Sequence, residues 1–316
     1  MPSVLLATAG YDHTIRLWEA SNGNCYHKLQ FNDSQVNQLK ITPDKQFIAA
    51  AGNPHVRLYD VNAKDANPVR VFDGHTGNVT ALGFHADGKW MFTGSEDGTL
   101  KIWDLRAPGA QREHGACTRE YESRSLINTV ELHPNQGELF TGDQAGAIRI
   151  FDLGENKMVK EIAPEWDTAV RSISIAPDGL TAVAANHKGN CFAWDLQKGE
   201  GGATQFRPTH RLHAHDAYIL KCLVSPDGHY LATTSADNTV RLWKTAELEL
   251  GQPWKTLIGH QRWVWDCVFS ADSAYLVTTS SDATVRLWDL AQAETIRHYT
   301  GHAKAVTAVA LHDLNS

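Results

Sequence analysis

Short apolar strands alternate with polar turns along the whole chain, and the alternation repeats. The segment "TVRLW" at residues 239–243 places apolar side chains at every second position, which is typical of a strand with one buried face. The turn "SADN" precedes it, and Asp paired with Asn or Gly favours a tight hairpin. A second apolar strand, the turn "SPDG" and a third strand stand before that turn. Each unit therefore predicts a small antiparallel sheet.

Seven aromatic residues close these units and define the period. The intervals between them run from 41 to 49 residues, and no linker or low-complexity tract interrupts them. Repeats of this length that each form a small sheet are typical of β-propellers. We therefore predict an all-β, seven-bladed β-propeller that occupies residues 1–316 as a single domain. The closing residues are Trp18, Tyr59, Trp103, Phe151, Trp194, Trp243 and Trp288.

The first unit lacks its first strand, and the end of the chain supplies one. Residues 301–313, "GHAKAVTAVALHD", contain a turn and one apolar strand with no continuation. Placed beside residues 4–9, that strand completes the first sheet. Closing the ring in this way removes the exposed sheet edges that an open array leaves. We therefore expect the N- and C-terminal strands to pair in one blade.

Polar residues recur at fixed distances before the closing aromatic residue. In four units an Asp stands six residues before it and a Thr ten residues before it, and in three units a His stands 28 residues before it. Such residues can form a buried chain in which the carboxylate accepts from the imidazole, the imidazole meets the Thr hydroxyl, and the hydroxyl accepts from the indole. With the ring closed, His302 joins the first set. The predicted members are His75, Thr93, Asp97 and Trp103; His215, Thr233, Asp237 and Trp243; His260, Thr278, Asp282 and Trp288; and His302, Thr8, Asp12 and Trp18.

The second, fourth and fifth units depart from this pattern. Their Asp position holds Asn53, Ala145 and Lys188 respectively. We expect the corresponding blades to rely on apolar packing alone. The mixed-charge stretch at residues 112–124, "REHGACTREYESR", predicts a solvated loop.

Composition narrows the class of protein. The chain has 29 Lys and Arg against 36 Asp and Glu, so its net charge of −7 does not favour nucleic acid as a partner. Its five cysteines include no C-x-x-C pair, which supports neither a disulfide framework nor a zinc site and fits a reducing compartment. No apolar run is long enough for a membrane span, and the N-terminus has no basic region of a signal peptide. We therefore expect a soluble, cytoplasmic chain.

Candidate catalytic chemistry is missing from the sequence. There is no G-x-x-x-x-G-K phosphate loop and no G-x-S-x-G nucleophile motif. The histidines at repeat positions are explained by the hydrogen-bond chain, and "HAHD" at residues 213–216 contains one of them rather than a metal-ligand pair. We therefore predict no catalytic residue, no metal site and no cofactor, and a protein that is not an enzyme.

Dipeptides at the repeat positions resemble a known family. Gly-His occurs at 74–75, 259–260 and 301–302, and Trp-Asp at 103–104, 194–195 and 288–289. Both are similar to the motifs of WD repeats, which implies a β-propeller. Longer segments, "LATAGYDHTIRLW", "DSQVNQL", "IAAAGNPHVRLYD", "HPNQGELFTGDQAGAIRIFDL" and "SADNTVRLW", resemble the G-beta-like subunit of target-of-rapamycin (TOR) kinase complexes.

This second resemblance implies a function. It implies a monomeric, non-catalytic propeller that binds the C-lobe of the TOR catalytic domain and stabilises the active kinase beside other TOR complex subunits. It also implies a cytoplasmic location, with endomembranes reached through the complex. The alternative is a WD-repeat scaffold of another assembly, such as a substrate receptor of a ubiquitin ligase, although no additional recruiting module is visible. A G-protein β subunit fits less well, because the chain begins in a strand and not in a coiled-coil helix.

The resemblance also indicates where a partner binds. WD-repeat propellers present the turns before their innermost strands around the mouth of the central channel, and the pairs there are Gln35/Asn37, Asn78/Thr80, Leu126/Asn128, Ala169/Arg171, Tyr218/Leu220, Trp263/Trp265 and Ala305/Thr307. One pair consists of two tryptophans, and exposed aromatic residues bordered by polar ones are typical of interface hot spots. For Trp265, filling space between blades is an equal alternative. We predict Trp263 as the anchor, surrounded by Trp265, Tyr218, Asn78, Gln35 and Asn37.

Overall fold

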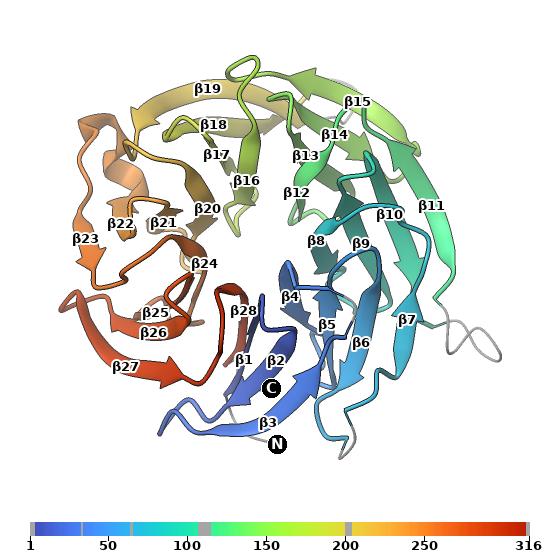
Figure 1. Cartoon of the computed structure of the whole chain (residues 1–316). Coiled ribbons are helices and arrows are strands. Elements are labelled where there is room, and N and C mark those ends of the chain that lie inside the picture. The colour runs from blue at the N-terminus through green and yellow to red at the C-terminus, as the bar shows by residue number, and fades with distance from the viewer. Residues whose placement is uncertain (1–3, 33, 64–65, 107–114, 200–203, 314–316) are drawn as a thin grey trace.

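Seven four-stranded antiparallel sheets stand around a central channel (Figure 1). The computed structural model describes residues 4–32, 34–63, 66–106, 115–199 and 204–313. Each sheet is one blade, and its first strand in the list below lies at the channel. The predicted seven-bladed propeller is therefore confirmed.

The first four blades contain the following strands. Blade 1 consists of β28 (Val306–His312), β1 (Leu5–Gly10), β2 (Thr14–Trp18) and β3 (Cys25–Gln30). Blade 2 consists of β4 (Gln38–Ile41), β5 (Phe47–Ala51), β6 (Val56–Asp60) and β7 (Arg70–Phe72). Blade 3 consists of β8 (Val79–Phe84), β9 (Trp90–Ser95), β10 (Thr99–Asp104) and β11 (Cys117–Glu122). Blade 4 consists of β12 (Ile127–Leu132), β13 (Glu138–Asp143), β14 (Ile148–Asp152) and β15 (Lys157–Ile162).

The remaining three blades follow the same order. Blade 5 consists of β16 (Val170–Ile175), β17 (Thr181–Asn186), β18 (Asn190–Lys198) and β19 (Thr204–His213). Blade 6 consists of β20 (Ile219–Val224), β21 (Tyr230–Ser235), β22 (Thr239–Lys244) and β23 (Lys255–Ile258), with the 3-10 helix η2 (Thr245–Leu250) before β23. Blade 7 consists of β24 (Val264–Phe269), β25 (Tyr275–Ser280), β26 (Thr284–Asp289) and β27 (Glu294–Thr300). Among the described residues, no helix has the length and apolarity that crossing a membrane requires.

The two ends of the chain meet in blade 1, as predicted. Strand β28 pairs with β1 in antiparallel register from Leu5 opposite His312 to Gly10 opposite Val306. The amide of Tyr11 extends this contact by donating to the carbonyl of Ala305 at 2.9 Å. The first and last strands therefore close the ring and leave no gap between blades 7 and 2 (Figure 1).

The apolar core lies between neighbouring blades. One cluster joins Leu17 and Leu29 of blade 1 to Ile48 and Tyr59 of blade 2, and all four are buried. Each sheet thus packs against a neighbour on both faces, and the second strand of each blade is buried along nearly its whole length. Burial of this kind repeats around the ring and stabilises each blade through its neighbours.

The predicted hydrogen-bond chain is present in four blades. In blade 3, the Nδ1 of His75 donates to Asp97 at 2.9 Å, Thr93 lies 2.7 Å from the Nε2, and the indole of Trp103 donates to Thr93 at 2.9 Å. Blades 6, 7 and 1 repeat these contacts with His215–Thr233–Asp237–Trp243, His260–Thr278–Asp282–Trp288 and His302–Thr8–Asp12–Trp18. The polar groups of the four residues in each set are thereby satisfied inside the sheet.

The expectation of apolar packing alone in the other blades is wrong. In blade 4, Arg149 is buried and pairs with the buried Asp143, and its Nε also donates to Glu161 at 2.7 Å. In blade 5, the carboxylate of Glu165 accepts from the side chains of Asn186 and Asn190 at 2.9 and 3.0 Å. Different residues from other positions thus supply the polar chain that the repeat lacks, because the buried polar backbone and side-chain groups there still require partners.

Blade 2 also contains polar contacts at this position. The hydroxyl of Ser34 accepts from the amide of Asn53 at 2.8 Å, and the hydroxyl of Tyr59 donates to the carbonyl of Gln30 at 3.2 Å. These contacts join blade 2 to the chain that leaves blade 1. Polar contacts therefore accompany apolar packing in this blade as well.

The predicted loop at residues 112–124 is wrong for residues 117–122. Residues 117–122 form β11, the outermost strand of blade 3, and Leu100 pairs with Tyr121 in its register. Most of this strand is exposed while Tyr121 is buried, so its charges belong to the solvent side of an edge strand. Residues 112–114 lie outside the described residues.

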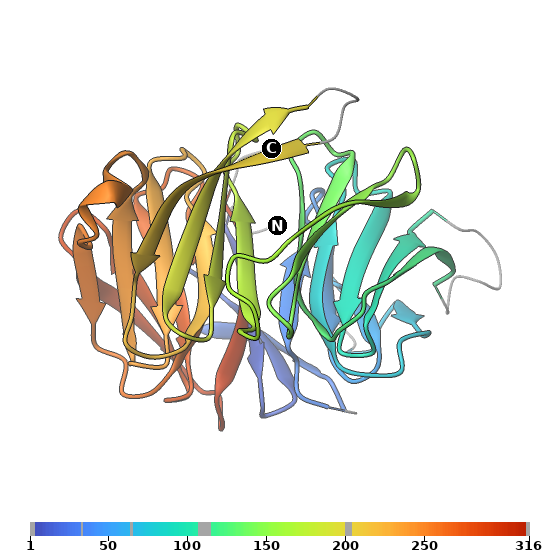
Figure 2. The same cartoon turned by 90° about the horizontal axis from the view of Figure 1, so that it is seen from above.

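Blade 5 has the longest outer strands. Its β18–β19 hairpin pairs from Asn190 opposite His213 to Lys198 opposite Thr204, and it projects away from the face seen in Figure 1 (Figure 2). Phe206 of this hairpin packs against Phe140 of blade 4 at 5.4 Å between ring centroids. The β18–β19 hairpin therefore packs against blade 4.

Candidate functional site

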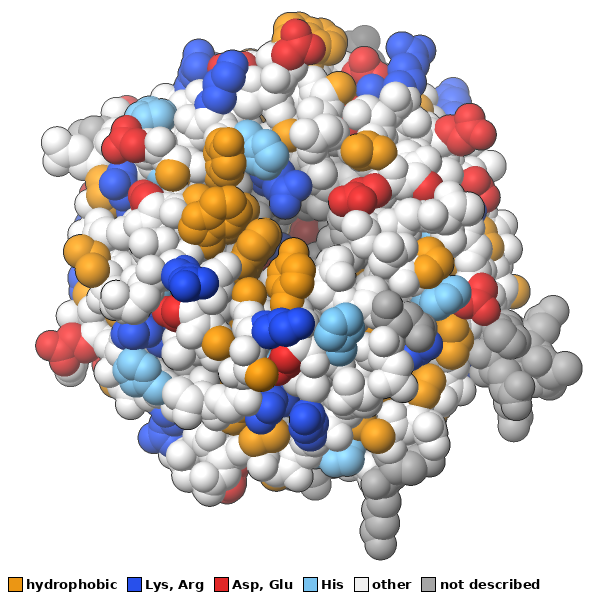
Figure 3. Space-filling model, in the orientation of Figure 1, with side chains coloured by type: hydrophobic (Ala, Val, Ile, Leu, Met, Phe, Trp, Pro, Cys, Tyr) orange, Lys and Arg blue, Asp and Glu red, His pale blue; other side chains and the backbone are white. Residues whose placement is uncertain are grey.

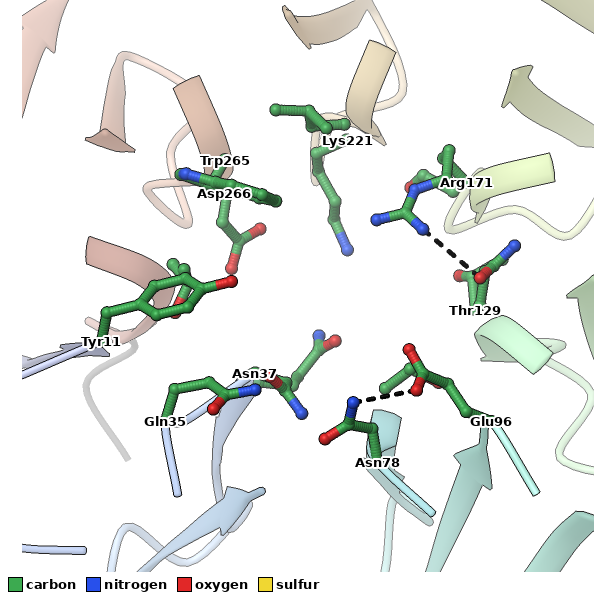
Figure 4. Close-up of a pocket in the computed structure, with 16 residues that line it drawn as sticks. Tyr11, Gln35, Asn37, Asn78, Glu96, Thr129, Arg171, Lys221, Trp265 and Asp266 are labelled. Atoms are coloured by element: carbon green, nitrogen blue, oxygen red, sulfur yellow. Dashed lines mark hydrogen bonds between the residues drawn. The ribbon is translucent and has the colours of Figure 1, made fainter. Parts of the chain in front are cut away.

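A bulge at the start of the innermost strands directs side chains to the channel mouth. In blade 3, Val79 pairs with Ser95 and Ala81 with Gly94, which leaves Thr80 as the extra residue. Bulges of this kind turn a side chain away from the regular alternation of the strand. The seven side chains at this position line one cavity of about 260 Å³, and Figure 4 looks into it. They are Asn37, Thr80, Asn128, Arg171, Leu220, Trp265 and Thr307.

Four of these seven residues connect neighbouring blades. Their side chains donate to a main-chain carbonyl at the start of the next innermost strand, at distances between 2.6 and 3.1 Å. We call them the inter-blade clamps. The pairs are Thr307 to Val36, Asn37 to Val79, Thr80 to Ile127 and Asn128 to Val170.

The other three positions form a continuous sector without such clamps. Blades 5, 6 and 7 place Arg171, Leu220 and Trp265 there, and Trp265 instead donates its indole N–H to Ser281 of its own blade at 2.6 Å. A guanidinium and two large apolar side chains thus replace the small hydrogen-bonding residues of the other blades. The channel mouth is therefore asymmetric.

Exposed aromatic rings lie on this same sector. Tyr218 is 50% exposed and Trp263 is 41% exposed. The Trp263 ring contacts Tyr218 at 6.3 Å and Trp265 at 5.8 Å between centroids, and Tyr218 lies 5.0 Å from His187. We call these four residues the aromatic patch. A cluster of hydrophobic side chains is visible beside the central hollow (Figure 3).

Trp265 forms the inner end of the aromatic patch. Its side chain is half-buried and lines the cavity, while Trp263 lies at the rim. The indole is fixed by its bond to Ser281, so little side-chain freedom is left to lose when another surface covers it. The structure thus brings Trp263, Trp265 and Tyr218 together.

Three further predicted residues lie on the other side of the channel mouth. Gln35, Asn37 and Asn78 are half-buried and line the cavity opposite Trp265 (Figure 4). Asn37 is an inter-blade clamp, and the amide of Asn78 donates to Glu96 at 2.8 Å. These two amides therefore have partners within the chain, and the structure does not bring them into contact with the aromatic patch.

The channel below the mouth contains opposite charges. Desolvation inside the channel lowers the pKa of Lys40, and the nearby Lys221 lowers it further. Burial by itself also lowers the pKa of Lys221, but the carboxylates of Asp266 and Glu131 outweigh it and raise the pKa. Two lysines, Lys40 and Lys221, and two carboxyl groups, those of Asp266 and Glu131, therefore interact with one another inside the channel.

Comparison with known proteins agrees with this architecture. The family model "WD domain, G-beta repeat" matches residues 23–60, 66–104, 206–244 and 251–289. The chain is 54% identical over 311 residues to the target of rapamycin complex subunit wat1 of Schizosaccharomyces pombe, which covers 98% of this chain and 96% of that protein. It is 50% identical over 315 residues to the target of rapamycin complex subunit LST8 of Saccharomyces cerevisiae, covering 99% and 100% of the two chains. The chain belongs to the LST8 family.

The alignments with LST8 relatives cover more of the chain than the matches of the repeat model do. The four matched repeats contain the closing residues of blades 2, 3, 6 and 7, whereas the relative from Schizosaccharomyces pombe aligns with 98% of the chain. The target of rapamycin complex subunit LST8-1 of Arabidopsis thaliana is 55% identical over 249 residues, 79% of each chain. The predicted resemblance to this family is therefore confirmed, including blades 4 and 5, whose repeats are irregular.

Several residues of the site were missed by sequence reasoning in this LST8-family chain. Trp166, in the turn that leads into blade 5, is 67% exposed on the face of the aromatic patch. Tyr11 and Glu96 come from the turns after β1 and β9 and line the cavity. Trp166 stands in the turn "PEWDT", which precedes an innermost strand as the turn of Trp263 does. A search for aromatic residues in the whole of each such turn, and not only beside the strand, would have found it.

The site does not have the arrangement of a metal centre. Among the described residues, no group of three or more His, Cys, Asp or Glu side chains is placed to hold a metal ion. What the sector of blades 5, 6 and 7 offers is an exposed aromatic surface with the guanidinium of Arg171 beside it. Such a surface is suited to binding another macromolecule.

Proposed function

We propose that this chain is a non-catalytic subunit of a TOR complex, where it binds the catalytic domain of the TOR kinase and supports its activity. The names of the relatives support this proposal, since two that align over nearly the whole chain are target of rapamycin complex subunits. The chain acts there as a monomeric propeller beside other subunits of the complex. It works in the cytoplasm and reaches endomembranes only as part of that complex.

The aromatic patch is the observation that carries this proposal. Large apolar side chains are normally buried, and a contiguous group of them on a propeller face indicates a surface that another protein covers. Trp and Tyr are also the residue types most often found at binding hot spots. Trp263 is the anchor, because it is exposed and contacts both Tyr218 and Trp265.

The polar residues across the channel complete the interface. Gln35 is half-buried, and its side chain forms no hydrogen bond within the part of the chain that the structure describes. Its amide is therefore free to bond to the kinase at the edge of the interface. Asn37 and Asn78 contribute van der Waals contact more than new hydrogen bonds to the interface, because their side-chain amide nitrogens already donate within the chain.

Substitution of Trp263 by Ala tests the proposal. We expect binding to the TOR kinase to weaken by about 2 kcal/mol or more, about thirtyfold, because a central Trp of an interface is removed. The melting temperature should stay nearly unchanged, because the side chain is exposed. The measurement is the affinity of the purified chain for the kinase catalytic domain, together with kinase activity after reconstitution.

A matched control uses an exposed aromatic residue at another place. Tyr26 lies on the outermost strand of blade 1 and is exposed to a similar extent as Trp263. Tyr26→Ala should bind the kinase and support its activity like the wild type. A Trp263→Ala variant that keeps the kinase, or loses it only because it unfolds, would refute the proposed interface.

A further inference from the structure

Arg171 holds an unusual position at the edge of the aromatic patch. It is the bulge residue of β16, and its side chain points into the channel mouth (Figure 4). Its Nη1 donates to Asn128 at 3.4 Å, while its Nε is buried without a hydrogen-bond partner. A guanidinium has five N–H donors, so most of its capacity is unused.

The two carboxylates that line the same cavity have other partners. Glu96 accepts from Asn78 at 2.8 Å, and Asp266 accepts from the amides of Val309 and Cys267 at 3.1 and 2.9 Å. No ion pair to Arg171 is formed within residues 4–32, 34–63, 66–106, 115–199 and 204–313. Burial lowers the pKa of Arg171, although Glu96 and Tyr11 partly counter this. The guanidinium therefore carries a positive charge that the chain does not neutralise.

This charge lies next to the aromatic patch. Burial and the positive charge of Arg171 together lower the pKa of His187 to about 4, so His187 is neutral at physiological pH. The His187 ring lies 5.0 Å from Tyr218, which contacts Trp263 in turn. Lys221, which lies deeper in the channel, already has carboxylates beside it, because Asp266 and Glu131 raise its pKa. Arg171 is therefore a cation inside the channel mouth that remains available to a partner.

We propose that the protein that docks on the aromatic patch inserts an Asp or Glu side chain into the channel mouth, where its carboxylate accepts two hydrogen bonds from Arg171. The planar guanidinium fork matches a carboxylate in a bidentate arrangement, and the pair strengthens as docking excludes water. A partner that covered Arg171 with apolar groups alone would bury an unpaired charge, which is costly. The pair therefore also selects against partners that lack the acid. This inference rests on the proposed function, since the partner is taken to be the TOR kinase.

The test compares Arg171→Gln with the wild type in binding to the purified TOR kinase catalytic domain. We expect the affinity to fall about tenfold or more, because one partner of a buried charge pair is removed. The loss should persist at high ionic strength, because salt screens a buried pair much less than exposed charges. Arg171→Lys keeps the charge without the fork, and its affinity should lie between those of the wild type and Arg171→Gln.

A matched control uses Arg124, an exposed arginine in the turn before blade 4 on the same face. Arg124→Gln changes the net charge equally and should weaken binding only at low ionic strength. If Arg171→Gln behaves like Arg124→Gln while its melting curve matches the wild type, the inference is wrong.

Phosphatase treatment of the kinase should leave binding unchanged. A loss as large as that of Arg171→Gln would indicate a phosphoryl group and overturn the assignment of a carboxylate.

The two proposals can fail separately. If Trp263→Ala loses the kinase and Arg171→Gln does not, the docking surface stands and the acidic side chain is rejected. If the wild-type chain itself does not bind the kinase, both proposals are rejected.

Discussion

At the scale of single residues, the repeated Asp is the centre of each polar chain. Asp97 accepts hydrogen bonds from His75, from the amide of Thr76 and from the hydroxyl of Thr99, at 2.9, 2.9 and 2.7 Å. Burial by itself raises the pKa of Asp97, but these bonds outweigh it and lower the pKa to about 2. The carboxylate therefore stays ionised and joins the turn before β8 to the turn before β10. Thr99 is a fifth member of the set, two residues after the Asp, that sequence reasoning did not include.

We predict that Asp97→Ala destabilises the propeller by about 1–3 kcal/mol, because it leaves a buried imidazole and a hydroxyl without their acceptor. Asp282→Ala should have a similar effect, since Asp282 makes equivalent bonds to His260 and Thr284. Urea unfolding measures both. Lys188→Ala is the control, because Lys188 stands at the same repeat position but makes only an exposed ion pair to Glu165. Its effect should stay within about 1 kcal/mol, and equal losses at all three positions would contradict the assignment.

At the scale of single blades, the irregular repeats contain polar chains built from other residues. In blade 4, Asp143 is fully buried, it pairs with Arg149, and its carboxylate also accepts from the amide of Ala147 at 2.8 Å. The guanidinium of Arg149 reaches Ser123 as well, at 2.9 Å. An ion pair thus occupies the place of the His–Thr–Asp–Trp chain. Its stability depends on both partners, because either charge alone is expensive to bury.

We predict that Asp143→Ala costs about 3–5 kcal/mol of the free energy of unfolding, more than Asp97→Ala, because it removes the fully buried partner of Arg149 and leaves only the partly exposed Glu161 to balance the buried charge. The measurement is again urea unfolding. Adding Arg149→Met to Asp143→Ala should recover much of the loss, because the uncompensated charge is then removed. If the single and double variants have the same stability, the ion pair does not have this structural role.

Sequence reasoning succeeded where an interaction recurs from one repeat to the next, and failed where it occurs once or joins neighbouring blades. The spacing of His75, Asp97 and Trp103 recurs in several units, so the chain of hydrogen bonds was predictable without coordinates. The replacement pair Asp143 and Arg149 occurs once, so no recurrence marked it. The inter-blade clamps depend on bulges, which shift register by one residue and leave no pattern in the sequence. Arg171 was therefore included in a set of flanking pairs without its role being recognised.

At the scale of the whole molecule, the closed ring holds the aromatic patch and the channel mouth in place. The clamps connect blades 1 to 5 in sequence, from Thr307 to Val36 and onward to Asn128 and Val170. Blades 5, 6 and 7 lack them and carry the aromatic patch instead. Strand β28 belongs to the sheet of blade 1 and packs against β24 and β25 of blade 7, so the clamp-free sector is still held at both ends.

We predict that deletion of residues 301–316 causes aggregation or a large loss of stability, and not the mild effect of trimming a tail. The deletion removes β28, which exposes the edge of β1 to pairing with other chains, and it removes His302, the partner of Asp12. Thermal unfolding and size-exclusion chromatography measure the outcome. His302→Ala separates the two causes, since it breaks the polar chain alone and should cost about 1–3 kcal/mol. A truncated chain that stays monomeric and melts like the full-length protein would show that blade 1 does not need its C-terminal strand.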